Sequence, residues 1–400
     1  MSSGFNPEAF DPHDPGFLAD PYPTYARFRA QAPIHTVKPF GSDWLFTYKD
    51  CKQVLDDTEV WIKNAPSDEP PPYGQFGVMS SFPSGLFGSD PPVHTQLRGI
   101  LQPLVDTAIK SASTITTKIG KPLLAAAKQH GRMELISDYA LPLPAGVLFT
   151  LLGIPNDPGV WSGLMSWQAA IVAAHDITQS AAVRGGGATC SMAVNTFFEG
   201  MGLSDPGATG NGLFARMCAA FAAAGLSPQQ VQMCAHDFLV AGYASTTFLI
   251  GTGTRSLLRN PEQLAALRKN PRLTNGAVKE MLRFDAPAQL VDRGAATATE
   301  VGGRTFNPGD RVTAVLGSAN HDPAVFTTPD QFMITRRNAK AHLSFGDGIH
   351  RCIGAPLAGL VAPVAFKMLL AAFSDLSFDG LAQWQTDPYL RAVSSLPLSF

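Results

Sequence analysis

The stretch Phe345-Gly346-Asp347-Gly348-Ile349-His350-Arg351-Cys352-Ile353-Gly354 decides how this 400-residue chain is interpreted. Three glycines surround one cysteine, and glycine permits tight turns because it lacks a Cβ atom. Residues 356–373 follow with apolar side chains at helical spacing, so Cys352 precedes a helix N-terminus. Free amides and the helix dipole at such a position stabilise a thiolate. The stretch therefore predicts a cysteine thiolate that can ligate a metal.

Two other interpretations of Cys352 compete with this one. The first is a buried structural cysteine in a glycine-rich loop, although three glycines and Phe345 around it favour a built site. The second is a zinc site with His342 and His350, which lacks a fourth ligand. The five cysteines of the chain are odd in number, widely spread and without a C-x-x-C pair, which argues against a disulfide framework. We therefore expect a reducing compartment.

The composition is that of an ordinary globular protein. At roughly 150 residues per domain, the length fits two or three domains, or one large α-rich domain with a smaller lobe. A net charge of −2 gives no electrostatic reason to expect nucleic acid or a membrane as a partner. Residues 1–19 have neither a basic start nor an apolar run, and the apolar stretch 238–250 is too short to span a bilayer. We expect a soluble, cytoplasmic protein.

Helical patterns dominate the middle of the chain. The capping box Ser227-Pro228-Gln229-Gln230 opens a pattern that continues to Pro261, which predicts one helix of about 32 residues, or ~48 Å. Other helices are expected over 22–31, 49–57 and about 273–285, and β-like patches over 290–293, 300–301 and 311–316. The sequence predicts a mainly α fold with a small β lobe. The α-rich parts are about 91–285 and 345–375, and the β-rich parts about 35–60 and 288–335.

Two pairs of ionisable side chains lie at helical spacing. Glu280 and Arg283 stand at i and i+3 in a helix that is apolar on more than one side, which favours a buried pair. His94 and Arg98 stand at i and i+4 behind Asp90, the expected N-cap of their helix. Two cationic donors on one face form a clamp for a carboxylate. A solvated surface pair is the alternative in both cases.

With these motifs in place, the chain resembles the cytochrome P450 family, in particular its soluble bacterial class. Phe345, Gly348, Cys352 and Gly354 meet the pattern F-x-x-G-x-x-x-C-x-G of the family's haem-binding loop. The resemblance implies one P450 domain over 1–400, a triangular helical prism with a long central helix over the haem. It implies haem b with Cys352 as the thiolate ligand of the iron. By resemblance, the propionates of the haem contact His94, Arg98, Arg293 and His350.

The family also has an E-x-x-R pair, which Glu280 and Arg283 match. In the family this pair is a buried structural element behind the haem loop. Its usual basic partner falls near residues 329–332, where Gln331 stands in this chain. We therefore expect a weaker network here.

The middle of the long helix reads Ala241-Gly242-Tyr243-Ala244-Ser245-Thr246-Thr247, where the family usually has A/G-G-x-acid-Thr. Ala244 stands in the place of the acid and Ser245 in that of the threonine, while a shift by one residue gives Ser245 and Thr246 these roles. Hydrogen bonding of these hydroxyls to a carbonyl one turn earlier is the structural alternative. Without the acid, protons must come through Ser245, Thr246, water or the substrate. Asp237, two turns earlier, either relays protons or faces solvent.

Position relative to the family also suggests the walls of a substrate pocket. They are Phe76, Met79, Phe82, Phe87, Val240, Ala241, Gln289 and Leu290. Such a lining predicts a small-to-medium apolar or aromatic substrate, with Gln289 as a polar anchor. The aromatic residues of the loop serve equally well as the core of a lid.

The resemblance implies a monooxygenase that inserts one atom of O₂ into an organic substrate. We expect a monomer that takes electrons from a separate ferredoxin or flavodoxin and an NAD(P)H reductase, with Arg351 attracting an acidic partner. Because Ala244 replaces the acid, the alternative is other haem-thiolate chemistry: peroxide-driven oxidation, nitric oxide reduction or a redox-neutral rearrangement. A non-enzymatic haem carrier is a third hypothesis, which the long capped helix does not favour.

Overall fold

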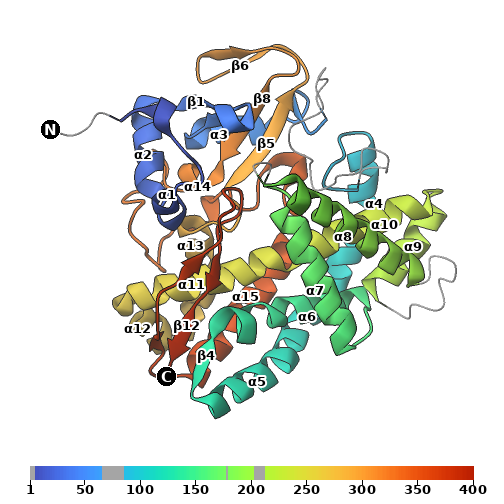
Figure 1. Cartoon of the computed structure of the whole chain (residues 1–400), viewed down its shortest axis with the longest axis vertical. Helices are drawn as coiled ribbons and strands as arrows, with labels where there is room; N and C mark the ends of the chain where they lie inside the picture. Colours follow the sequence, from blue (N-terminus) through green and yellow to red (C-terminus); the bar gives the residue numbers. More distant parts are fainter. Residues whose placement is uncertain (1–4, 65–84, 177–178, 202–211) are drawn as a thin grey trace.

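The computed structural model describes residues 5–64, 85–176, 179–201 and 212–400 of the chain. Helices make up most of it, and the largest sheet lies at one end of the molecule (Figure 1). The helices are α1 (Pro15–Ala19), α2 (Tyr22–Gln31), α3 (Tyr48–Asp56), α4 (Val93–Ala108), α5 (Ala112–His130), α6 (Pro142–Leu152), α7 (Pro158–Ala173), α8 (Ala181–Gly200), α9 (Leu213–Ala223), α10 (Pro228–Gly242), α11 (Ala244–Arg259), α12 (Pro261–Lys269), α13 (Thr274–Phe284), α14 (Leu316–Ala319) and α15 (Ala355–Ala372).

The strands form small sheets. They are β1 (Ile34–Val37), β2 (Ser42–Leu45), β3 (Trp61–Ile62), β4 (Arg132–Glu134), β5 (Leu290–Ala295), β6 (Thr299–Val301), β7 (Arg304–Phe306), β8 (Arg311–Val315), β9 (Ser377–Phe378), β10 (Gln383–Trp384), β11 (Val393–Ser395) and β12 (Pro397–Ser399). The largest sheet has the order β1-β2-β8-β5-β3, in which only β2 and β8 run parallel. Arg293 of β5 pairs with Val312 of β8. This sheet brings β3 and β5 together from distant parts of the chain.

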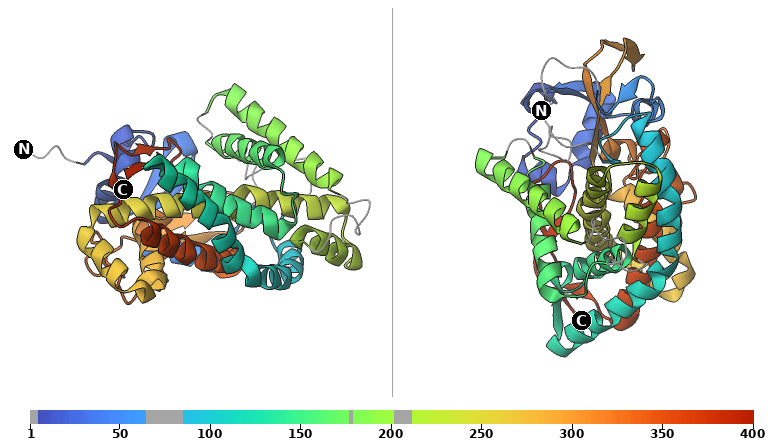
Figure 2. Two further views of the ribbon diagram at one scale, coloured as in Figure 1. Left: turned by 90° about the horizontal axis from the view of Figure 1, so that it is seen from below. Right: turned by 90° about the vertical axis from the view of Figure 1, so that its right-hand side faces the viewer.

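The helices α10 and α11 run through the middle of the helical part. Helices α7 and α8 lie on one side of them, and α13 and α15 on the other (Figure 2). By length and composition, α15 is apolar enough to cross a membrane. It packs against α5, α11 and α13, however, so its apolar character is explained by its place inside the protein.

The expectation of one continuous helix up to Pro261 is wrong. The capping box is present, with Ser227 and Gln230 bonded to each other's backbone, but the helix ends at Gly242 and a new one begins at Ala244. Tyr243 between them has φ −126° and ψ −30°, outside the helical region. End signals in the sequence mark where a helix starts and stops, and none of them marks this one-residue break.

The other expected elements lie within a few residues of their predicted places. Helix α2 has the predicted bounds 22–31, and α3, α13 and α15 differ from their predicted ranges by one residue or so at each end. The β-like patches correspond to β5, β6 and β8. A mainly α fold with a small β lobe is therefore confirmed, while the long central helix is interrupted.

Candidate functional site

Cys352 lies at the end of a loop that leads into α15. Its backbone N–H donates to the carbonyl oxygen of Phe345 at 2.9 Å and so closes the loop. Gly346 and Gly348 have φ of 66° and 65°, values that a residue with a Cβ atom rarely adopts. Of the five cysteines, all within the described residues, Cys352 alone is exposed. The loop thus closes its backbone while Cys352 stays exposed.

The backbone N–H groups of Gly354 and Ala355, at the start of α15, act to lower the pKa of the Cys352 thiol. The Ala355 N–H donates to the Cys352 carbonyl oxygen at 3.3 Å. Desolvation by the surrounding protein raises the pKa of the Cys352 thiol, whereas these donors and the cations Arg98 and Arg351 act in the opposite direction. Donors and cations of this kind stabilise the thiolate relative to the thiol. The loop is therefore suited to hold an anionic sulfur against a metal cation.

The residues expected to bind propionates come from three separate elements. His94 and Arg98 lie on α4, Arg293 lies on β5, and His350 precedes Cys352. The ring centroids of His94 and His350 are 4.4 Å apart. Arg98 Nη1 donates to the carbonyl oxygen of Arg351 at 2.7 Å, which ties α4 to the cysteine loop. The structure thus brings α4 and the cysteine loop together as expected.

Two buried nitrogen atoms in this group make no hydrogen bond to the described residues, Arg293 Nε and His350 Nε2. The Arg293 side chain is buried at 3% exposure, and burial lowers its pKa to about 10. Burial, followed by the charges of His350 and Arg98, lowers the pKa of His94 to about 4. Arg293 Nη1 donates to the Asp292 carbonyl oxygen at 2.8 Å, and His350 Nε2 lies 3.7 Å from Asp90 Oδ1. A buried N–H group that makes no hydrogen bond nevertheless costs free energy. An anionic ligand placed here would supply the missing acceptors.

Lys63 belongs to the same group, and the sequence analysis missed it. It follows β3 and is buried, and its ammonium lies 4.4 Å from the centre of the Phe87 ring. Burial, and then the charge of Arg293, lowers the pKa of Lys63 well below its ordinary value. No sequence signal marks it, because its place depends on the pairing of β3 with β5.

Asp90 has a different function from the expected one. Helix α4 begins after Pro92 without a side-chain cap, so the expectation of Asp90 as its N-cap is wrong. The Asp90 carboxylate instead accepts the backbone N–H groups of Lys63 and Asn64, each at 2.8 Å. Asn64 Nδ2 also donates to the Gly88 carbonyl oxygen at 2.7 Å. These bonds join the two described ends of the loop, so Asp90 was placed correctly in the region but not in its role.

The break at Tyr243 lies beside two exposed residues. Between 231 and 258, only Ala241 and Ser245 fall in the exposed class. Ser245 Oγ donates to the Ala241 carbonyl oxygen at 3.5 Å, while Thr246 and Ala244 are buried. Of the two hydroxyls left open by the sequence, that of Ser245 is therefore the accessible one, with the expected bond to the preceding turn.

Asp237, the nearest acid on this helix, holds a loop. Its Oδ2 accepts the backbone N–H of Phe87 at 3.0 Å. A Cβ atom on Gly85 would lie 2.9 Å from the Met233 carbonyl oxygen, so the loop approaches the helix closely. Burial raises the pKa of Asp237 to about 7, opposed by the N–H groups of Phe87 and Leu86. This use of the carboxylate argues against a free proton relay.

The Glu280–Arg283 pair is fully buried and has an additional basic partner. Arg283 donates to both carboxylate oxygens of Glu280 at 2.8 Å, and Arg336 Nε donates to both at 3.1 Å. The expectation of a weaker network at Gln331 is therefore wrong. Arg336, five residues further on, supplies the charge, and Gln331 supplies its carbonyl oxygen to Arg283 and Arg336. The sequence pattern indicated Gln331 and not Arg336, because the shape of the loop decides which side chain reaches Glu280.

The expected pocket residues have different places. Phe76, Met79 and Phe82 lie outside the described residues. Phe87 is exposed, and Val240 and Leu290 are buried in separate apolar clusters. Among the described residues of this set, Ala241 is exposed beside Ser245. The role of these residues as pocket walls stays a prediction.

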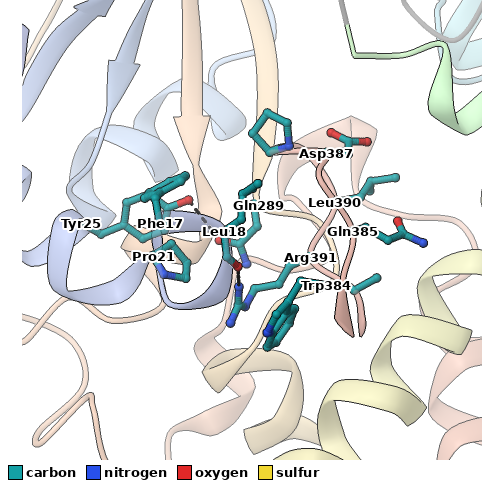
Figure 3. A pocket seen from close by; sticks show the side chains of 12 residues that line it. Phe17, Leu18, Pro21, Tyr25, Gln289, Trp384, Gln385, Asp387, Leu390 and Arg391 are labelled. Atoms are coloured by element: carbon teal, nitrogen blue, oxygen red, sulfur yellow. Dashed lines mark hydrogen bonds between the residues drawn. The ribbon is translucent and has the colours of Figure 1, made fainter. Parts of the chain in front are cut away.

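Gln289 lines a small pocket between α1, α2 and the β10–β11 hairpin (Figure 3). Its Oε1 accepts the Tyr25 hydroxyl at 3.2 Å, and its Nε2 donates to the Ala286 carbonyl oxygen at 2.7 Å. The cavity holds about 20 Å³, room for one water molecule. The carboxamide is thus bonded inside the protein, which argues against the expected role of Gln289 as a substrate anchor. The other lining residues are Phe17, Leu18, Pro21, Trp384, Gln385, Asp387, Pro388, Leu390, Arg391 and Ala392.

Comparisons with known proteins agree on one family. The Cytochrome P450 family model matches residues 216–388. The chain is 34% identical to the cytochrome P450 monooxygenase PikC of Streptomyces venezuelae, over 96% of this chain and 91% of that protein. It is 32% identical to 6-deoxyerythronolide B hydroxylase of Saccharopolyspora erythraea, over 96% of each.

Solved structures show the same fold. Myxobacterial cytochrome P450 CYP267B1, in complex with myristic acid, superposes with a TM-score of 0.89 at 29% identity and 99% coverage of both chains. P450BioI, in complex with a fatty-acyl-loaded acyl carrier protein, gives 0.85 at 26% identity, over 96% of this chain and 99% of that one. The expected P450 fold is thus confirmed.

The described residues also fit the family's cofactor, haem. Cys352 is exposed at the start of α15, where two N–H groups act to lower the pKa of its thiol, and the buried Arg293 Nε and His350 Nε2 make no hydrogen bond, which propionates would provide. Within the described residues no cluster of three or more histidine, cysteine or acidic side chains is placed to hold a metal ion, which leaves the zinc interpretation without support. With sequence relatives, structures and site in agreement, the chain belongs to the cytochrome P450 family and is a bacterial haem monooxygenase.

Proposed function

We propose that Cys352 is the thiolate ligand of haem b and that the enzyme inserts one atom of O₂ into a small-to-medium apolar or aromatic substrate. The observation that carries this proposal is the exposed Cys352 at the start of α15, where the N–H groups of Gly354 and Ala355 act to lower the pKa of its thiol. Bound through a thiolate, haem supplies the cleavage of the O–O bond that such a reaction needs. The remaining steps depend on the protein's own residues.

On the cysteine side, the protein holds the cofactor and sets the charge of its ligand. His94, Arg98, Arg293 and His350 would receive the propionates. Arg293 Nε makes no hydrogen bond, and His350 Nε2 has only the Asp90 carboxylate at 3.7 Å, which favours this use. Phe345 closes the loop through its carbonyl oxygen, and Gly348 permits the turn. A Cβ atom on Gly354 would lie 3.7 Å from the Cys352 sulfur, in ordinary contact, so Gly354 leaves room for a closely bound group.

On α11, Ser245 is the candidate proton donor. Its hydroxyl is exposed and donates its proton to the Ala241 carbonyl oxygen, so it would have to exchange this bond for one to the bound group before it passes the proton on. Thr246, the next residue, is buried and has a secondary role in proton delivery in this proposal. Ala244, buried, provides no proton, so water ordered by Ser245 completes the delivery.

We further propose that a ferredoxin or flavodoxin, reduced by an NAD(P)H reductase, delivers the electrons to a monomeric, cytoplasmic enzyme. Arg351 is exposed directly beside Cys352 and offers a positive charge to an acidic partner. The names of the relatives do not fix the substrate of this chain. A screen for compounds that change the spin state of the ferric haem identifies it.

A second candidate function keeps the haem-thiolate site but uses peroxide or nitric oxide in place of O₂. Ala244 at the usual acid position, together with the engagement of Asp237 by the Phe87 N–H, favours it. Peroxide already carries the protons that reduction of O₂ requires, so the missing acid matters less. Turnover with peroxide alone, compared with turnover on NADH and a ferredoxin, separates the two functions.

The primary test is the spectrum of the reduced carbon monoxide adduct. The wild-type Soret band should have the position of thiolate ligation, and Cys352→Ala and Cys352→His should lose it. Cys218→Ala is the matched control, because Cys218 is a buried thiol and should leave the band unchanged. A thiolate band that persists in Cys352→Ala would assign the ligand to another residue.

A further inference from the structure

One side chain bonds both the last turn of α10 and the residue of the break itself. Gln168 lies on α7 and is buried at 5% exposure. Its Nε2 donates to the Val240 carbonyl oxygen at 3.0 Å, and its Oε1 accepts the Tyr243 hydroxyl at 3.1 Å. Val240 lies before the break and Tyr243 is the break itself. A carboxamide from another helix thus bridges the point at which α10 ends.

These two bonds replace what a continuous helix would provide. In an uninterrupted helix, the Val240 carbonyl oxygen would accept the N–H of Ala244, four residues later. Gln168 satisfies this oxygen instead, and a buried carbonyl left without a partner would cost about 1–3 kcal/mol. The Tyr243 hydroxyl, also fully buried, uses the other end of the same carboxamide. The pair therefore stabilises the interrupted conformation over the straight one.

Helix α6 fixes the same break from a second direction. The Tyr243 ring packs edge-on against Phe149, with centroids 5.7 Å apart. A Cβ atom on Gly242 would lie 2.9 Å from Leu148 Cδ2, so the chain passes close to α6 at this point. Aromatic packing places the phenol, and the hydrogen bond to Gln168 then fixes its direction.

The break separates Ala241 and Ser245, the two exposed residues between 231 and 258. Their bond, Ser245 Oγ to the Ala241 carbonyl oxygen at 3.5 Å, spans Tyr243. We propose that Gln168 and Tyr243 are positioning residues, which hold the break and thereby set the orientation of the Ala241 carbonyl and the Ser245 hydroxyl. This inference deepens the proposed function and rests on it for the role of Ser245 in proton delivery. The contacts of Gln168 with Val240 and Tyr243, called the clamp below, do not depend on that function.

The test is a double-mutant cycle on the full-length, haem-loaded protein. Gln168→Met removes both hydrogen bonds at similar volume, Tyr243→Phe removes one and keeps the ring, and the third variant combines them. Tyr139→Phe is the matched control, because Tyr139 is a buried phenol that donates to a backbone carbonyl, that of Ala365 at 2.8 Å. Two measurements report on the surroundings of Ser245. One is the titration of the ferric haem with imidazole, and the other is the peroxide released per NADH with a surrogate ferredoxin.

Each single variant should shift the dissociation constant of imidazole by about threefold or more, the size of one lost hydrogen bond. The double variant should resemble Gln168→Met alone, because the two residues act as a unit. Peroxide per NADH should rise in the same order, while the carbon monoxide spectrum stays that of a thiolate. Additive effects, or effects no larger than those of Tyr139→Phe, would overturn the proposal.

Hydrogen–deuterium exchange keeps the inference testable apart from the cofactor. Amides of residues 241–247 should change their exchange rates in Gln168→Met and Tyr243→Phe and not in Tyr139→Phe. If the wild type lacks a thiolate spectrum but this exchange pattern holds, the proposed function fails and the clamp stands. If the spectrum is present and the exchange rates are unchanged, the clamp alone fails.

Discussion

The cysteine loop and the break in the long helix both interrupt regular structure, but they do so by different means. On the cysteine side, the Phe345 carbonyl, two glycines with positive φ and the first amides of α15 all lie between residues 345 and 355. On the helix side, the break at Tyr243 depends on Gln168, 75 residues away, and on α6. Contacts within one segment leave a pattern in the sequence, whereas contacts between side chains far apart in the chain leave none.

The largest effect is expected for Arg283→Met, and it would show that residues far along the chain also stabilise the cysteine loop. Arg283 donates to the Asn320 carbonyl oxygen at 3.0 Å, and the Asn320 carboxamide bonds Leu343 and Ser344, directly before the loop. Arg283→Met leaves Glu280 as a buried charge that has lost its closest partner, which should lower the free energy of unfolding by about 3–5 kcal/mol. Urea denaturation, followed by circular dichroism, measures this loss.

The control for this prediction is Arg272→Met, because Arg272 is an exposed arginine just before the same helix. It should change the free energy of unfolding by no more than about 0.5 kcal/mol. Equal losses in Arg272→Met and Arg283→Met would mean that the buried network gives the loop no particular support.

The next prediction sharpens the comparison at the cofactor. Arg293 is buried with Nε unbonded, so an anionic propionate would gain a charge-assisted hydrogen bond there. Arg293→Gln should weaken haem affinity by about tenfold to a hundredfold. Haem transfer to an excess of a high-affinity acceptor protein measures this, with Arg304→Gln on exposed β7 as the control. Identical transfer rates in the two variants would remove Arg293 from the set of propionate ligands.

How much the sequence could predict follows the same division. The glycines, Cys352 and the helix after them were evident, because the loop is built within one segment. The pairing of β3 with β5 placed Lys63 beside Arg293, and the fold of the loop around residue 330 brought Arg336 to Glu280. Neither contact has a spacing that a sequence pattern contains. The break at Tyr243 was missed for the same reason, since capping signals describe only the ends of the helix.

A smaller effect is expected on the helix side. Ser245→Ala removes the exposed hydroxyl, whereas Thr246→Ala changes a buried one. With a ferredoxin, its reductase and a substrate, Ser245→Ala should lower the ratio of product to peroxide by roughly tenfold. This is less than the effect of about 10²–10⁴-fold that a positioned general acid has. Thr246→Ala should change that ratio less. The reverse order, measured by product and peroxide formed per NADH, would assign the proton-delivering role to Thr246.

The last effect depends on pH and concerns the contact between the helix and the loop after residue 84. Burial raises the pKa of Asp237 from 3.8 to about 7, so the folded protein disfavours the ionised form. The resulting contribution to the free energy of unfolding is complete below pH 3.8 and is lost as the pH rises to about 7. Asp237→Asn keeps an oxygen for the Phe87 N–H but cannot ionise. Urea denaturation at a series of pH values measures the free energy of unfolding of both proteins. The wild type should therefore lose stability relative to Asp237→Asn between pH 3.8 and about 7, and the difference should stay constant above that pH. A constant difference over the whole range would mean that water reaches the carboxylate, and that the loop is held by the hydrogen bond without any cost of burying the charge.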